Sequence, residues 1–499
     1  MVAPHSAAVL PLASRALQFA HACPDPELFM FLPRCLLTLL SIALALPCGA
    51  ATTRASVQAP PAAPFAVSDA QLTPDHWIRR SPDAQRPHLN AAQIDAFTTR
   101  LLRDDASMRD LAQLPALLTG ATVRAQIEAL SAPPTRTLYA ADGQLIQPAQ
   151  LTELRRLLAL DTLPAQVTPR FALVVKRAAL RTFPSTLRVF SGPDEHDIDR
   201  FQESALYPGT PVAVLHSSAD GAWAFVLAAN YAAWVASDQI AEGPRADVLQ
   251  YAQRRPRLMV TGARVQTAYT PELPAVSALS LDMGTNLPLQ RTWPPQQPVN
   301  GQLPLAAHVV QLPLRGSDGR LQLVPALVPR GADVRMGPLP ATDEALLRQA
   351  FKFLGERYGW GNDYHARDCS GFVLDVYRSV GIALPRNTGD QARSRVLRSV
   401  AFTADAPLEQ RLQQLAQLRI GDLIYIPGHV MMVIGHAHGA PWVIHDVAGA
   451  SYRAADGSVQ RARLNGVSVT PLLPLLATDG TAFIDHITRI QRIAPIDSP

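Results

Sequence analysis

The sequence predicts a multidomain α+β protein, because successive regions of the chain carry different hydrophobic periodicities. Apolar residues three and four apart predict a helical segment over 68–160. Short alternating runs with frequent turns predict two small β-barrels, over 165–245 and 255–336. From 342 to 499, two helical patterns precede several strands, which is the order of an α+β domain. The length of 499 residues agrees, since single cores rarely exceed about 250–300 residues.

Composition excludes several classes of protein. The 45 Lys and Arg against 41 Asp and Glu leave a net charge of +4, too weak to indicate a nucleic-acid partner. A hydrophobic fraction of 48% with 17% charged residues favours packed cores over disorder. Four cysteines are too few for a disulfide scaffold. Three of them lie before residue 50, so Cys369 is the thiol of the predicted folded body.

Residues 1–50 are predicted to be an upstream extension followed by a secretory signal peptide that starts at Met30. A single arginine, the apolar run Leu36–Leu46 and a few small residues follow in the order that such signals require. This run is too short to span a bilayer, which needs about 20 residues, so we expect no integral membrane span and a periplasmic or secreted location. A lipid anchor on Cys48 and retention as an uncleaved anchor remain open alternatives.

A Pro/Ala-rich linker over 51–67 separates this leader from the helical segment. Within that segment, Ala91–Leu102 and Gln150–Leu160 place apolar residues on one helical face, and Asn90 is a suitable helix N-cap. No residue pattern there indicates chemistry, so we expect a structural role.

The two barrels are predicted from short strands and hairpin turns. In the first barrel, Asp220-Gly221 is a tight-turn signal that precedes the strand Trp223–Leu227. In the second, Ser317–Gly319 is the predicted hairpin between Val309–Leu314 and Leu321–Leu327.

The last region begins with a helix whose N-cap is Thr342, followed by acidic residues that suit the positive helix start. This helix is expected to end near Tyr358-Gly359, and a second helix is expected to begin at Cys369 and end at Gly381. Four strands are predicted after it, namely Asp422–Ile426, Val430–Ile434, Trp442–Val447 and Phe483–Ile490.

Cys369 is the candidate nucleophile. A thiol in the first turn of a helix feels the positive end of the helix dipole, which lowers the thiol pKa and favours the thiolate. The polar neighbours Asp368 and Ser370 argue against the alternative, a buried cysteine that acts as a small hydrophobe. Gly359 and Gly361 are expected to leave room for a substrate backbone.

A thiol nucleophile needs a base, and His429 follows a Pro-Gly turn at the start of a predicted strand. If the next strand pairs with it, His445 can fix the tautomer of that imidazole through a hydrogen bond. Asp446 points to the other face of the same strand and ranks lower as the orienting group. His436 and His438 read as part of a hairpin loop, so neither a catalytic metal nor a cofactor is expected.

These residues carry a family resemblance. Tyr358–Phe372, Leu384–Gln391, Arg419–Leu423 and Gly428–Val430 occur in the order found in the NlpC/P60 family, papain-like cysteine peptidases that cut bacterial cell-wall peptides. The resemblance covers about 150 residues. Upstream, Asp197–Ser204 and Ser218–Trp223 resemble the bacterial SH3 domains found in multidomain members of this family.

The resemblance implies a triad of Cys369, His429 and His445 that hydrolyses the bond between γ-D-glutamate and a diamino acid in peptidoglycan stem peptides. It also implies residues that bind the free amino end of the substrate: Tyr358, Asp368, Ser370 and Thr388, joined by Asp199 or Glu203 of the first barrel. Tyr358 is alternatively a hydroxyl donor to the oxyanion. Some relatives have a serine at the position of Thr388. The hydroxyl is kept, but the added methyl group of threonine leaves the substrate contact of Thr388 open.

Two other functions stay open at this point. A catalytically silent wall-binding protein would rely on the SH3-like barrels alone. A thiol amidase or acyltransferase would use the same thiol on another bond. In each case we expect a monomer.

Overall fold

The computed structural model describes residues 65–494, which belong to one compact unit. The predicted extension, the signal peptide and nearly all of the linker over 51–67 lie outside the described residues. Within 65–494, no helix combines the length and the apolar character needed to cross a membrane.

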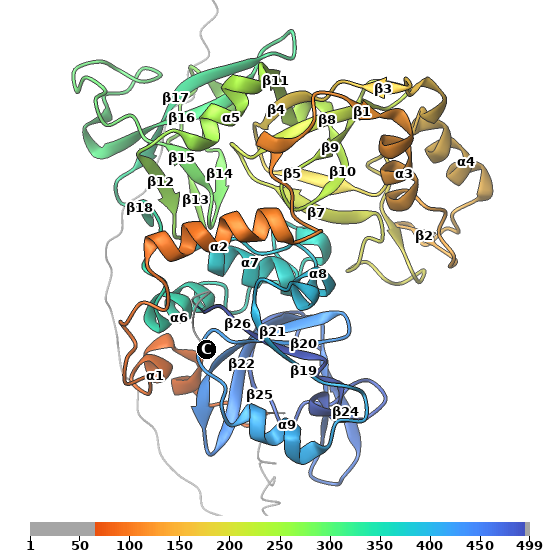
Figure 1. Ribbon diagram of the computed structural model, residues 1–499, viewed down its shortest axis with the longest axis vertical. Helices are drawn as coiled ribbons and strands as arrows, with labels where there is room; N and C mark the ends of the chain where they lie inside the picture. The colour runs from red at the N-terminus through yellow and green to blue at the C-terminus, as the bar shows by residue number, and fades with distance from the viewer. Residues whose placement is uncertain (1–64, 495–499) are drawn as a thin grey trace, which may run out of the picture. The chain divides into compact units, whose positions relative to one another are not determined.

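The structure divides the predicted helical segment 68–160 between two cores (Figure 1). α1 (Pro74–Ile78) and α2 (Ala91–Asp104) form its first part, and the Asn90 side chain caps α2 by accepting from the N–H of Gln93, as the sequence predicts. Trp77 of α1 is fully buried in the core of the C-terminal domain. The first part therefore packs as a portion of that domain.

The second part of the segment packs on the first barrel. It consists of α3 (Gly120–Leu130) and α4 (Pro148–Leu157) with three short strands, β1 (Leu118–Thr119), β2 (Tyr139–Ala140) and β3 (Gln166–Val167). Val123 and Ile127 of α3 share a buried cluster with Trp234 of the barrel. Burial of this apolar helix face against the barrel is what holds the segment in place.

One seven-stranded antiparallel sheet forms the first barrel, in the order β11-β4-β8-β9-β10-β5-β7. Its strands are β4 (Arg170–Val174), β5 (Ala178–Arg181), β7 (Gln202–Leu206), β8 (Pro211–Ser217), β9 (Trp223–Leu227), β10 (Ala232–Ala236) and β11 (Ile240–Gly243). A further short strand, β6 (Val189–Phe190), pairs with β2. The predicted turn lies between β8 and β9, with Gly221 at a φ of +68°, a backbone conformation that favours glycine.

The second predicted barrel consists of three small sheets around one core, preceded by α5 (Arg245–Gln253). Its strands are β12 (Arg257–Val260), β13 (Arg264–Gln266), β14 (Ser280–Asp282), β15 (Asn286–Pro288), β16 (Ala307–Arg315), β17 (Leu321–Pro329) and β18 (Val334–Met336). β16 and β17 pair as the predicted hairpin, with Gly319 at a φ of +81° in its turn.

The C-terminal domain packs helices on a six-stranded sheet of order β19-β26-β20-β21-β22-β25. Its helices are α6 (Asp343–Phe351), α7 (Cys369–Ser379), α8 (Thr388–Arg393), α9 (Leu408–Leu415) and α10 (Phe483–His486). Its strands are β19 (Arg398–Ala401), β20 (Leu423–Ile426), β21 (His429–Ala437), β22 (Ala440–Val447), β25 (Gly466–Pro471) and β26 (Arg489–Arg492), with a separate hairpin of β23 (Ala450–Arg453) and β24 (Val459–Ala462).

Two predicted boundaries in this domain are wrong. The first helix, α6, ends at Phe351 and not near Tyr358-Gly359, because the chain turns through Gly355 at a φ of +82°. The predicted strand Phe483–Ile490 is instead α10 followed by β26. Its buried Phe483, Ile484 and Ile487 follow a helical spacing, which the alternation of a strand does not fit.

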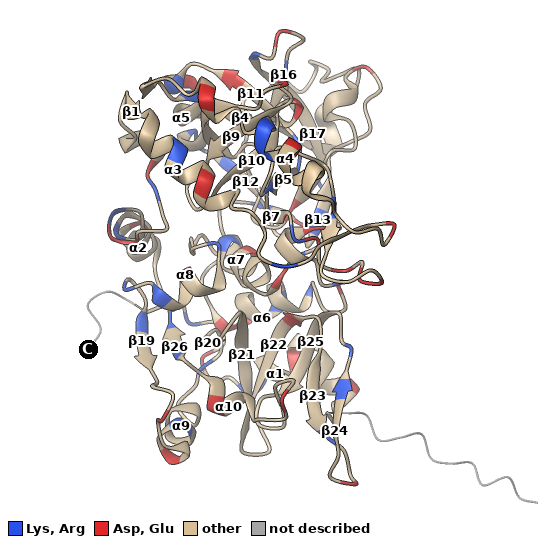
Figure 2. Ribbon diagram, turned by 90° about the vertical axis from the view of Figure 1, so that its right-hand side faces the viewer, with Lys and Arg blue, Asp and Glu red and all other residues tan. Residues whose placement is uncertain are grey.

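A buried arginine joins the two barrels to the C-terminal domain. Arg367 is fully buried and donates to Asp375 at 2.8 Å and to Glu356 at 2.7 Å within its own domain. It also lies 3.2 Å from Asp282 of the second barrel, which Arg177 of the first barrel approaches to 2.6 Å. Figure 2 shows acidic and basic positions close together around α7. Because an isolated buried charge is strongly unfavourable, these contacts require all three parts to be in place.

We expect Arg367→Met to destabilise the protein by about 3–5 kcal/mol, because Asp282 and Asp375 would lose a buried partner. Urea denaturation measures the change in the free energy of unfolding. The control is Arg156→Gln, which removes an arginine that is 62% exposed in its pair with Glu153 and should leave the free energy of unfolding nearly unchanged. Equal losses in the two variants would contradict a structural role for the buried network.

Candidate active site

Cys369 is the first residue of α7, as the sequence predicts. The side chain of Asp368 caps the helix by accepting from the N–H of Gly371 at 2.8 Å. The Cys369 Sγ lies 3.5 Å from the hydroxyl of Thr388 and 4.0 Å from the carbonyl oxygen of Gly428. The thiol is therefore placed next to the residue that precedes His429, although only 5% of Cys369 is exposed.

His429 and His445 lie on neighbouring antiparallel strands, β21 and β22, as predicted. Nε2 of His429 is 2.9 Å from Nδ1 of His445, and Nε2 of His445 is 3.1 Å from the hydroxyl of Thr470. The sequence analysis missed Thr470 because it did not recognise β25 as a strand. The alternation of Val467, Ser468, Val469 and Thr470 is a strand signal that was available in the sequence.

His429 can act as a base for only one of the two possible donor–acceptor directions of the hydrogen bonds from His429 through His445 to Thr470. If His445 donates from Nε2 to Thr470, its Nδ1 can accept from the Nε2–H of His429. The Nδ1 of His429 then carries no proton and can take one from a thiol. We assign the tautomers in this way because the reverse direction protonates Nδ1 of His429 and removes the base.

Burial shifts both members of the thiol–imidazole pair toward their neutral forms. It raises the pKa of Cys369 to about 12, with a further contribution from the Asp368 charge. Burial lowers the pKa of His429 to about 4. The pKa of the thiol is therefore raised and not lowered as expected from the helix start, because burial and the Asp368 charge disfavour the thiolate. The thiol and the imidazole are both neutral near pH 7.

Asp446 does not orient either histidine. It is fully buried, and neither carboxylate oxygen has a hydrogen-bond partner among residues 65–494. Burial raises the pKa of Asp446 well above its usual range, and the negative charges of Asp368 and Glu356 add to the effect. Asp446 directly follows His445 on β22, so strand alternation directs the two side chains to opposite faces of the sheet.

Arg386 organises the polar side of the site, although sequence reasoning assigned it no role. Its guanidinium donates to Asp368 at 2.7 Å, to Ser370 at 2.9 Å and to Ser204 of the first barrel at 2.6 Å. Burial opposes ionisation of Asp368, but the Arg386 charge outweighs it and lowers the pKa of that carboxyl. Asp368 is therefore a buried, ionised acceptor beside Cys369.

The structure brings one of the two predicted barrel carboxylates to this region. Glu203 accepts from the hydroxyls of Tyr231 and Thr182, each at 2.5 Å. Burial and Glu203 raise the pKa of Tyr231, and the charges of Arg386 and Asp368 also act on that hydroxyl. The edge of the barrel thus lies beside the start of α7, and Tyr231 joins the candidate residues that the sequence did not reveal.

Asp199, the other barrel candidate, is not brought to the thiol. It is buried and ion-paired with Arg181 at 2.7 Å, and it accepts from the N–H groups of Val189 and Phe201. These contacts lie inside the barrel and occupy both carboxylate oxygens. Asp199 therefore shapes the loop before β7 and is not available to a substrate.

The loop that precedes α7 holds Tyr358 next to the thiol. Tyr358 is 8% exposed, and its pKa is raised by burial and by the charges of Cys369 and Asp368.

Gly359 and Gly361 do not leave room for a substrate, contrary to expectation. A Cβ at Gly359 would lie 2.3 Å from the carbonyl oxygen of Asp363, and one at Gly361 would meet Gln202 of the barrel at 2.9 Å. These glycines allow the loop to pack closely.

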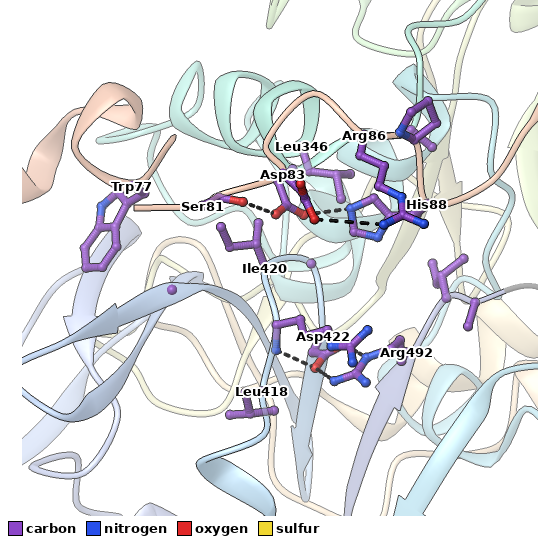
Figure 3. Close-up of a pocket in the computed structure, with 18 of the residues that line it drawn as sticks. Trp77, Ser81, Asp83, Arg86, His88, Leu346, Leu418, Ile420, Asp422 and Arg492 are labelled. Atoms are coloured by element: carbon purple, nitrogen blue, oxygen red, sulfur yellow. Dashed lines mark hydrogen bonds and ion pairs between the residues drawn. The ribbon is translucent and has the colours of Figure 1, made fainter. Parts of the chain in front are cut away.

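A separate cavity of about 710 Å³ lies between the N-terminal segment and the C-terminal domain (Figure 3). Ser81 and His88 line it from the N-terminal side, and both contact Asp343 at 2.7 Å. Leu346, Ile420 and Arg492 line it from the other side. None of the predicted site residues lines this cavity, so it is distinct from the thiol site.

Fold and site together define a multidomain protein with a thiol and two linked imidazoles, the arrangement that thiol hydrolases use. A sequence model of the NlpC/P60 family matches residues 355–468, and a model of the SH3 domain of SH3b1 type matches residues 188–236. The chain therefore carries an NlpC/P60 domain with an SH3 domain upstream, which confirms the family predicted from the sequence.

Similarity to individual proteins is local in sequence and extensive in fold. The chain is 43% identical over 60 residues to a gamma-D-glutamyl-L-lysine dipeptidyl-peptidase of Bacillus cereus, covering 12% of this chain and 18% of that protein. It is 44% identical over 64 residues to a probable endopeptidase p60 of Listeria innocua, covering 12% and 14%. The chain thus spans less than a fifth of either relative. An NlpC/P60 endopeptidase of Photobacterium damselae subsp. piscicida has the same fold, with a TM-score of 0.67 and 16% identity over 86% of this chain and 97% of that one.

We expect Thr470→Val to destabilise the protein by about 1–3 kcal/mol, because it leaves the buried Nε2 of His445 without a partner. Thr470→Ser keeps the hydroxyl and should recover most of that loss. Chemical denaturation of the three proteins measures the difference. A valine variant as stable as the serine variant would show that the Thr470 hydroxyl does not hold His445.

Proposed function

We propose that this protein is a cysteine endopeptidase that hydrolyses the amide bond between γ-D-glutamate and a diamino acid in peptidoglycan stem peptides. The observation that carries the proposal is the line of polar groups from His429 through His445 to Thr470, together with the position of the Cys369 Sγ 4.0 Å from the carbonyl oxygen of Gly428, the residue before His429. The named activity of the Bacillus cereus relative, which is similar over 60 residues, supports the choice of bond.

The chemistry follows from the geometry of these groups. Sγ of Cys369 attacks the amide carbonyl while Nδ1 of His429 takes the thiol proton. His429 then protonates the leaving amine, and a water molecule activated by the same imidazole hydrolyses the thioester. In this proposal His445 fixes the tautomer in which Nδ1 of His429 is the acceptor, and it stabilises the imidazolium as it forms. The reaction needs neither a metal nor a cofactor.

The oxyanion of the tetrahedral intermediate needs hydrogen-bond donors near Sγ. The N–H of Gly371 is already bound by the Asp368 side chain, so the earlier N–H groups at the start of α7 are the available backbone donors. The hydroxyl of Tyr358 is a second candidate donor, since it lies close enough for the Cys369 charge to affect its pKa.

We propose that the amino end of the substrate lies between the barrel and the start of α7. Asp368 and Glu203 supply negative charge on the two sides of this space, and Ser370 and Tyr231 supply hydroxyls. The negative charge of two carboxylates suits a free ammonium group, whereas an acylated stem in intact wall offers no positive charge at this position. Thr388 is placed to contact the substrate next to the thiol. The expected location is the periplasm or the exterior of the cell.

One other function has an observation in its favour. The SH3 match over residues 188–236 is compatible with a protein that binds the wall without cutting it. A thioester at Cys369 would also react with an amine, in which case the product gains a group that hydrolysis does not add. Product masses separate these outcomes.

We expect the protein to release the dipeptide from free L-Ala-γ-D-Glu-diamino acid tripeptide, and Cys369→Ala to lower the rate by several orders of magnitude because the nucleophile is removed. The assay separates products by mass. The same amount of enzyme on intact sacculi, whose stems lack a free amino end, should release much less. Equal rates for the wild type and Cys369→Ala would exclude thiol catalysis, and equal release from both substrates would exclude the proposed recognition of the amino end.

The pH profile of kcat/KM should have an acid limb with its midpoint near pH 4, well below the usual histidine pKa of about 6.5. Burial keeps His429 neutral in the folded protein until the pH approaches its lowered pKa of about 4, and only the neutral imidazole accepts the thiol proton. Initial rates between pH 3.5 and 8, with circular dichroism at each pH to verify folding, measure the limb. A limb centred at pH 6 or above in folded protein would contradict this assignment.

A further inference from the structure

The loop that follows α2 connects the two sides of the active-site region. The N–H of Arg109 in this loop donates to the carbonyl oxygen of Ala229, in the turn between β9 and β10, at 2.7 Å. The side chain of Arg109 lies within electrostatic range of Asp390 on α8. Met108, the preceding residue, is buried in the same core cluster as Cys369. The loop is therefore held in place by the hydrogen bond between Arg109 and Ala229 and by the burial of Met108.

These contacts place Arg109 at the rim of the proposed substrate site. Ala229 is two residues before Tyr231, whose hydroxyl donates to Glu203. Asp390 is two residues after Thr388, whose hydroxyl lies 3.5 Å from the Cys369 Sγ. Figure 1 shows α8 next to the carboxyl end of α2, from which the loop continues. Arg109 is thus linked to the barrel turn by its backbone N–H, and the charge of Asp390 on α8, the helix that contacts the thiol, acts on its guanidinium.

Arg109 is a cation with little to neutralise it. Its guanidinium makes one weak hydrogen bond, to the carbonyl oxygen of Ser107 at 3.4 Å, and no carboxylate within residues 65–494 is at ion-pair distance. Half-burial lowers the pKa of the guanidinium, and the Asp390 charge opposes this shift, so the group remains a cation. The other nearby arginines already form ion pairs, Arg386 with Asp368 and Arg393 with Asp390.

The proposed substrate supplies an anion of the charge that Arg109 lacks as a partner among residues 65–494. In a γ-glutamyl peptide the side-chain carboxyl forms the scissile amide, so the α-carboxylate of the same residue stays free. We infer that Arg109 binds this α-carboxylate, so that the enzyme distinguishes γ-D-glutamyl from amidated γ-D-isoglutaminyl stem peptides. The inference rests on the proposed function and adds to it a residue from the N-terminal segment, outside both the NlpC/P60 and the SH3 matches.

The test compares two synthetic tripeptides that differ only in this group, one with the α-carboxylate and one with the α-carboxamide. For Arg109→Gln we expect kcat/KM on the carboxylate peptide to fall roughly ten- to hundredfold, mainly through KM, as for the loss of a charge-assisted hydrogen bond. On the carboxamide peptide the variant should match the wild type. The control Arg103→Gln removes an arginine from the same segment that is 70% exposed, and should change neither value.

The outcomes separate the inference from the proposed function. If the wild type cleaves the peptides but Arg109→Gln loses kcat/KM equally on both, or loses none on either, the role of Arg109 is overturned and the peptidase proposal stays intact. Wild-type cleavage of neither peptide would overturn both. Should Arg109→Gln fail to fold by circular dichroism, Arg109→Lys must show a loss confined to the carboxylate peptide, since lysine keeps the charge but not the paired donors.

Discussion

The fully buried guanidinium of Arg367 is the interaction on which the arrangement of the site depends. It contacts Asp375 and Glu356 in the C-terminal domain and Asp282 in the second barrel. Arg367 directly precedes Asp368 and Cys369, so the charges that hold the domains together also fix the start of α7. A separation of the barrels from the C-terminal domain would break the contact between Arg367 and Asp282 and expose both charges to water, and the position of the thiol is thereby coupled to domain packing.

The same coupling explains why the first barrel borders the candidate active site. Gln202 donates to the carbonyl oxygen of Gly361 at 2.9 Å, and Ser204 accepts from Arg386 at 2.6 Å, so strand β7 contacts the segments that precede α7 and α8. Glu203 lies between these two anchored residues. Its carboxylate therefore has a fixed position, and a site that selects for a charged amino end needs such preorganisation.

Local patterns predicted the helix start at Cys369, the adjacent histidine strands and the hairpin turns, because periodicity and turn residues act over short stretches of chain. The remaining features depend on tertiary packing. Arg386, Tyr231 and Thr470 reach the site from separate elements, and no local pattern distinguishes Glu203 from the structural Asp199. The neutral thiol also escaped prediction, since the burial of Cys369 that raises its pKa depends on tertiary packing.

The division of the N-terminal segment between two cores has a consequence for how the chain folds. Trp77 packs against Trp442, and Ser81 donates to Asp343, which lies 262 positions later in the sequence. Contacts of such high sequence separation close only after most of the chain has been synthesised, which slows folding. The core that supports the thiol is therefore complete only after the N-terminal segment with Trp77 has packed against the C-terminal domain.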